Sequence, residues 1–228
     1  MTHPHDQSPV NPLPPVVIAL AVFLIGIELV FVAGNSGLVG GPEAAGWRIA
    51  TIENWGFREP LFAWMVENGR YPLKDVARFF TYPFLHLSFT HLLFVLVFLL
   101  ALGKMVGEVF SAFAFLVVFF GSAIVGALAY WLVWDTNVVL FGGYPAVYGL
   151  IGAYTFILWA ELGATGGNQL SAFRIIAFLL GIQLIFSLLF GAGLNWVSEV
   201  FGFVAGFGLS FLVSPGGWSR VVQRLRQR

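Results

Sequence analysis

Apolar residues along this chain fall into six long stretches separated by short polar or glycine-rich segments. Each stretch is close to the roughly 20 residues that a helix needs to cross the hydrocarbon core of a bilayer. The pattern therefore predicts an all-α, polytopic membrane protein built as a bundle of six transmembrane helices. The expected spans cover about residues 15–33, 78–103, 109–134, 139–161, 170–190 and 196–213.

The remaining segments divide the chain into a membrane domain, residues 14–214, and two tails. Residues 1–13 form a polar, proline-rich tail that lacks the basic start of a secretory signal, so we expect it to be retained. Residues 215–228 form a basic tail. A long first loop, about 34–77, mixes charges with Trp and Phe and is expected at the headgroup level, with a free soluble loop as the alternative.

Composition supports the membrane class. Of 228 residues, 59% are hydrophobic and 10% are charged, whereas soluble domains carry about 25% charged residues. This excludes an ordinary soluble domain and a disordered chain, and the lipid bilayer is an expected partner. The formal net charge of zero gives no argument for a nucleic-acid partner, and the absence of Cys excludes disulfides, thiolate nucleophiles and Cys-ligated metals.

An even number of spans places both termini on the same side of the membrane. The unopposed arginines of the C-terminal tail predict that this side is the cytoplasm. Lys104 and Arg174 then also lie near the cytoplasm, while the first loop places several basic residues outside. We expect a multi-pass protein of a bacterial-type plasma membrane.

Few of the ionisable residues in the spans are expected at membrane depth: Glu28, His86, His91 and Glu199. A span that begins near residue 78 places His86 about 12 Å along the helix and His91 near mid-depth. The interrupted start of the fourth span, residues 142–145, lies in the same outer half. Because polar groups and irregular backbone at this depth face water or protein, the pattern predicts a hydrated cavity that opens outward. Each residue could instead bond a neighbouring helix, and we expect this structural role for Glu28.

No metal or cofactor is expected. His86 and His91 are five residues apart, which on one helix is about 140° of rotation, so they would not share a face.

The sixth span carries a small residue at every fourth position, from Ser198 through Gly202 and Gly206 to Ser210. Such a row lets another helix approach closely. The pairs Gly149–Gly152 and Ser122–Gly126 indicate the same kind of packing on the fourth and third spans.

From about residue 78 to 213 the chain resembles the rhomboid family of intramembrane serine proteases. The segment RFFTYPFLHLSFTHLLF, with His86 and His91, resembles the rhomboid segment with paired histidines, and GKMVGE resembles the turn that follows it. The run GGYPAVYGLIGAY is similar to the family's G-x-S-G block, and SEVFGFVAG is similar to its Ala-His segment.

The resemblance implies a Ser–His dyad and an oxyanion hole that includes a His and an Asn. Here the nucleophile position is Tyr144, the base position is Glu199 and the Asn position is Val95. His91 matches the histidine of the oxyanion hole, and His86 matches the other histidine of the family's pair. Tyr148 matches an aromatic residue that in the family packs on the catalytic His. In addition, Pro145 replaces the second Gly of G-x-S-G.

These departures favour a pseudoprotease that binds transmembrane helices of client proteins without cleaving them. The client helix would lie against the second, fourth and fifth spans of this protein. The pocket that contacts the client would comprise His86, His91, Tyr144, Tyr148 and Glu199. The alternative is an active intramembrane endopeptidase with non-standard residues, for which Ser198 is the nearest substitute hydroxyl. A proton-coupled transporter is a third hypothesis, supported only by the two glutamates and two histidines.

Overall fold

The computed structural model describes residues 12–190 and 193–215, and within α8 the side chains up to Ile182. The described residues form helices and turns, with one isolated antiparallel bridge between Phe57 and Leu140. The elements are α1 (Pro15–Asn35), η2 (Pro42–Gly46), α2 (Trp47–Trp55), α3 (Glu59–Asn68), α4 (Leu73–Thr81), η3 (Tyr82–Phe84), α5 (Phe89–Gly107), α6 (Ala112–Val133), α7 (Tyr144–Ala164), η4 (Gln169–Phe173), α8 (Arg174–Phe190) and α9 (Trp196–Val213).

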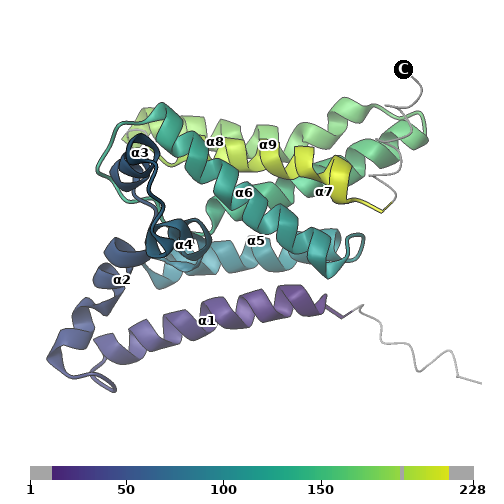
Figure 1. The fold of residues 1–228 in the computed structure, drawn as a ribbon. Coiled ribbons are helices and arrows are strands. Elements are labelled where there is room, and N and C mark those ends of the chain that lie inside the picture. Colours follow the sequence, from purple (N-terminus) through teal and green to yellow (C-terminus); the bar gives the residue numbers. More distant parts are fainter. Residues whose placement is uncertain (1–11, 191–192, 216–228) are drawn as a thin grey trace, which may run out of the picture.

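Helices α6, α7 and α9 form the centre of the bundle, and α5 lies between α7 and α1 (Figure 1). The outer helix α1 keeps large apolar side chains exposed, among them Val22, Phe23 and Leu29. A helix that is apolar around most of its circumference suits burial in protein on one side and contact with lipid on the other.

Helices α7 and α9 are almost in backbone contact. A Cβ on Gly206 would collide with the backbone of Gly149, and a Cβ on Gly202 would collide with that of Pro145. Because only glycine allows this approach, the close packing predicted from the row of small residues is confirmed, and it holds the start of α7 against α9.

Five helices in the described part of the chain are long and apolar enough to cross a membrane: α1, α5, α6, α7 and α9. The predicted first, third and sixth spans coincide with α1, α6 and α9 to within a few residues, and the fourth corresponds to α7. The predicted fifth span falls on η4 and α8, whose last side chains lie outside the described residues, so the count of six stays a prediction.

The predicted start of the second span is wrong. Helix α4 ends at Thr81, a short 3-10 turn follows, and the spanning helix α5 begins only at Phe89. Pro83 favours a helix interruption because it lacks an N–H. Ser88 then caps α5, with its hydroxyl oxygen accepting the backbone N–H of His91 at 3.2 Å. His86 therefore precedes the helix instead of lying on it.

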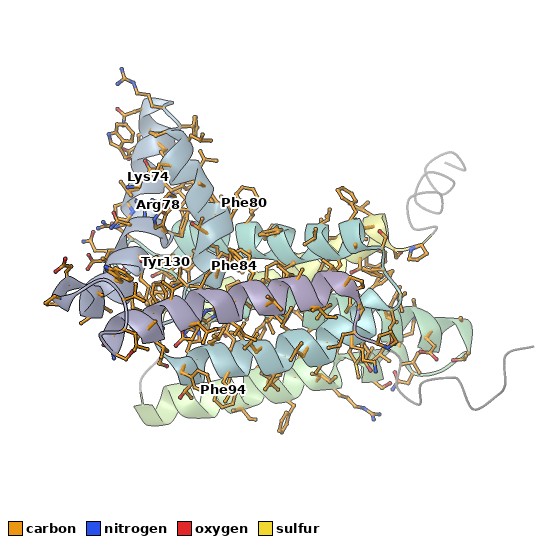
Figure 2. The ribbon with its side chains drawn as sticks, turned by 90° about the horizontal axis from the view of Figure 1, so that it is seen from below. Lys74, Arg78, Phe80, Phe84, Phe94 and Tyr130 are labelled. Carbon is orange, nitrogen blue, oxygen red and sulfur yellow. The ribbon has the colours of Figure 1, made fainter. Side chains whose placement is uncertain are left out.

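The segment predicted as a long first loop contains helices η2, α2, α3 and most of α4. This group lies at one end of the bundle, where α1 ends and α7 begins (Figure 1). Figure 2 shows Lys74 and Arg78 on the helix that projects from this end. Arg78 ties the segment together, because its guanidinium donates to Asp75 at 2.9 Å and to the carbonyl of Gly56 at 2.9 Å.

Candidate functional site

The site forms where the turn before α7 meets the segment before α5. Gly142 has φ +102°, a conformation that favours glycine, and its N–H donates to the carbonyl of Tyr82 at 2.9 Å. The phenol of Tyr82 in turn donates to the carbonyl of Ala123 on α6 at 2.7 Å. The next N–H, of Gly143, donates to His86 Nε2 at 3.4 Å. These bonds fix the first turn of α7, which carries Tyr144.

Three rings follow one another at this turn. His86 and His91 meet edge to face with centroids 5.0 Å apart, and His91 stacks on Tyr144 at 5.0 Å with an interplanar angle of 20°. The expectation that the two histidines point apart is thus overturned, because His86 is not on the same helix. A Cβ on Gly142 would lie 2.8 Å from the ring of His91, so this glycine also provides the space for the stack.

The close pair of histidines does not amount to a metal cluster. Among residues 12–190 and 193–215, no group of three or more His, Asp or Glu side chains could hold an ion. His91 Nε2 is buried and has no hydrogen-bond partner within the described part of the protein.

Arg48 of α2 links α1 to the histidine segment. Its guanidinium forms two hydrogen bonds with the carboxylate of Glu28, at 2.7 and 2.8 Å, and a third with the carbonyl of His86 at 2.8 Å. It also lies 5.0 Å from the ring centre of Phe31. Glu28 is 5% exposed, and its ion pair gives it the structural role expected for it.

Burial and the nearby charges of His91 and Arg48 lower the pKa of His86 to about 3. The imidazole is therefore neutral at physiological pH, which leaves Nε2 able to accept the N–H of Gly143. The protonated form would lose this bond, so the neutral ring is part of what positions the start of α7.

A cavity of about 290 Å³ borders Tyr144, between α5, α7, α8 and α9. It is lined by Phe98, Tyr144, Val147, Tyr148, Ile151, Leu179, Ile182 and Glu199. Glu199, on the first turn of α9, is 8% exposed. The structure thus divides the five predicted pocket residues: Tyr144, Tyr148 and Glu199 line the cavity, whereas His86 and His91 are not among its lining residues.

Two other residues singled out from the sequence are turned away from this cavity. Val95 packs against Gly143, because a Cβ added to Gly143 would lie 2.7 Å from Cγ1 of Val95. Ser198 is completely buried, and its hydroxyl donates to the carbonyl of Asn195 at 2.6 Å. Neither lines the cavity that Glu199 lines.

Sequence reasoning missed Arg48 and the apolar walls of the cavity. Arg48 lies 20 residues after Glu28 in a segment rich in charges, so no local spacing distinguishes it from its neighbours. The usable signal was Glu28 itself, since a carboxylate at membrane depth needs a partner. The walls Leu179 and Ile182 look like any other apolar residues of a spanning helix.

Comparison with known proteins agrees with this architecture. The family model of the rhomboid domain matches residues 73–216, which is more than half of the chain. A protein of Bacillus subtilis (strain 168), described as "Putative rhomboid protease YdcA", is 32% identical over 139 residues. That alignment covers 59% of this chain and 66% of the relative, just under two thirds of its length. The chain, an integral multi-pass helical membrane protein, therefore belongs to the rhomboid family.

Proposed function

We propose that this protein is a rhomboid-fold pseudoprotease that binds transmembrane helices of client proteins without cleaving them. The observation that carries the proposal is the position of Tyr144 at the first turn of α7. Its ring, not a serine hydroxyl, lines the cavity at this position, and it stacks on His91 at 5.0 Å.

The chemistry of the residues near Tyr144 also supports a pseudoprotease. A serine nucleophile needs an adjacent base that takes its proton, but the cavity offers the carboxylate of Glu199 beside two phenols. A phenyl ester formed on Tyr144 would also be a poor acyl store, because phenolate leaves readily. Val95 supplies no hydrogen-bond donor, and the loss of one oxyanion donor typically costs about 10²–10³ in rate.

Proteolysis by non-standard residues is the competing function, favoured by the description of the relative from Bacillus subtilis as a putative protease. Ser198 is the hydroxyl nearest to Glu199 along the chain. Its burial and its bond to the carbonyl of Asn195 direct it away from the cavity, so the geometry gives it no access to a substrate there.

Client binding would take place along α5, α7 and α8, the three helices that wall the cavity with α9. The polar groups of Tyr144, Tyr148 and Glu199 would then contact a polar or helix-breaking residue of the client. In this proposal the protein spans a bacterial-type plasma membrane with both termini in the cytoplasm.

A fluorophosphonate probe distinguishes the two functions. The purified full-length protein in liposomes is labelled beside a rhomboid that has the Ser–His dyad. We expect no labelling above that of heat-denatured protein while the control is labelled. Labelling that is lost on denaturation would demonstrate a reactive hydroxyl and overturn the pseudoprotease assignment.

Binding is tested by photocrosslinking in the same liposomes. Benzoylphenylalanine at position 144 should crosslink a single-span helical peptide with a polar residue more strongly than an all-leucine peptide. The same probe at the exposed Leu132 of α6, which does not line the cavity, should show no such preference. Equal crosslinking from both positions would contradict a specific client site.

A further inference from the structure

We propose that the cavity between α5, α7, α8 and α9 accepts a basic side chain of the client's membrane-spanning helix. This inference rests on the proposed client binding and names the class of client. It follows from the charge, the walls and the size of the cavity, together with the depth of Glu199.

The cavity has an acidic group among the lining side chains that the structure describes. These include one carboxylate, that of Glu199, and the two phenols of Tyr144 and Tyr148; the other described lining side chains are apolar. A carboxylate in a site of low dielectric favours a cation over a neutral or anionic group far more than it does in water. The aromatic faces act in the same direction, because a cation over a tyrosine or phenylalanine ring is attracted by the ring quadrupole.

The apolar walls fit the rest of a basic side chain. Phe98, Leu179 and Ile182 line the cavity together with the polar residues. Lysine and arginine carry long methylene stems that pack on apolar surface while the charged head reaches a polar partner. The lining therefore matches both parts of such a side chain.

The size of the cavity, about 290 Å³, gives room for one long side chain. Ile182, one of the lining residues, is exposed. In this proposal the client backbone stays outside, along the side of Ile182, and one long side chain reaches in.

The depth of Glu199 makes such a client possible. Glu199 is three residues after the start of α9 at Trp196, which places it about 4.5 Å along the helix. A basic residue near the end of a spanning segment costs much less than one at the bilayer centre. The expected client thus carries Lys or Arg within two helical turns of one end of its span. That end is the one on the side of the membrane where α9 begins.

The test uses the full chain in phosphatidylcholine vesicles with benzoylphenylalanine in place of Phe94. This residue is exposed on α5 one turn from Phe98 (Figure 2). The probes are single-span leucine–alanine peptides with Lys, Met or Glu at one position in the first two turns, and a peptide with Lys at the centre. We expect the first Lys peptide to crosslink about tenfold more than the Met peptide, as for a hydrogen bond to a charged group.

Glu199→Gln should reduce this preference for Lys to near unity, while Tyr148→Phe, which keeps the charge and the ring, should retain most of it. Ile182→Trp, at the exposed edge of the cavity, should lower crosslinking of the Lys peptide without removing a charge, which provides a second test if Glu199→Gln fails to fold.

The outcomes separate the two levels of the proposal. Strong and equal crosslinking of Lys, Met and Glu peptides would overturn the basic-side-chain inference and leave client binding standing. Absence of crosslinking for every peptide would overturn the proposed function itself. A preference for Lys that disappears when phosphatidylethanolamine is added would assign the cavity to a lipid ammonium group and overturn the client assignment.

Discussion

At the scale of single residues, the ion pair between Glu28 and Arg48 has the clearest energetic role. It joins α1 to α2, and through the carbonyl of His86 it reaches the segment that positions α7. The side chains are 7% and 20% exposed. Removal of one partner leaves the other charge poorly solvated, which is why single substitutions in such pairs are costly.

We expect Glu28→Gln to destabilise the protein by about 2–3 kcal/mol, less than for a fully buried pair because Arg48 retains some exposure. The double variant Glu28→Gln, Arg48→Met should recover part of this loss, since no charge is left without its partner. Thermal unfolding in detergent measures these two variants and the single variant Arg48→Met. A double variant that loses the sum of the two single effects would mean that the residues act independently.

His86 predicts an acid sensitivity at the same scale. Its folded pKa of about 3 lies below the ordinary value near 6.5, so between these pH values the unfolded chain binds the additional proton. Stability therefore falls as the pH is lowered through this window, by at most about 1.4 kcal/mol per pH unit from this group.

The measurement is the midpoint of thermal unfolding from pH 7 to pH 4.5. Carboxylates contribute to the same curve, so the comparison is with His86→Gln, which keeps a hydrogen-bond acceptor and has no titrating ring. The variant should lose less stability over this range than the unmodified protein. Parallel curves for the two proteins would show that His86 does not hold a lowered pKa.

At the scale of elements, the contact between α7 and α9 depends on glycine. Gly206→Ala should destabilise the bundle by about 1–3 kcal/mol, because the added methyl collides with the backbone of Gly149. Gly208→Ala is a matched control on the same helix, since its Cβ would meet nothing within 4 Å. The control should be neutral or slightly stabilising, because Ala favours helix more than Gly. Similar unfolding temperatures for both variants would contradict this packing.

At the scale of the whole molecule, the group of helices α2–α4 lies at one end of the bundle and α7 ends at the other (Figure 1). The proposed topology places the first end outside and the second in the cytoplasm. The chain contains no Cys, so single-cysteine variants report one position at a time.

Glu67→Cys, at an exposed position of α3, should react with a membrane-impermeant maleimide on intact cells. Thr165→Cys, exposed just after α7, should react only after permeabilisation. Labelling in the reverse pattern would place the termini outside and overturn the orientation inferred from the arginine-rich tail.

Hydropathy determined the membrane class and the positions of α1, α6 and α9, and residue spacing determined the row of small residues that packs on α7. These properties belong to consecutive or periodically spaced residues, and the bilayer and the helix geometry act on them directly. The resemblance to rhomboids likewise followed from short motifs in order along the chain, which the match of residues 73–216 confirms.

The tertiary structure alone decided the arrangement of the site. His86 lies outside the helix because Pro83 interrupts the helical segment and Ser88 caps the start of α5. The ring centroids of His86 and His91 are therefore 5.0 Å apart. Arg48 pairs with Glu28, 20 residues away in the chain. Tyr144 stacks on His91 and also lines the cavity that Glu199 lines. These contacts join segments distant in the chain. They depend on how closely the backbones approach one another, and neither hydropathy nor spacing encodes that distance.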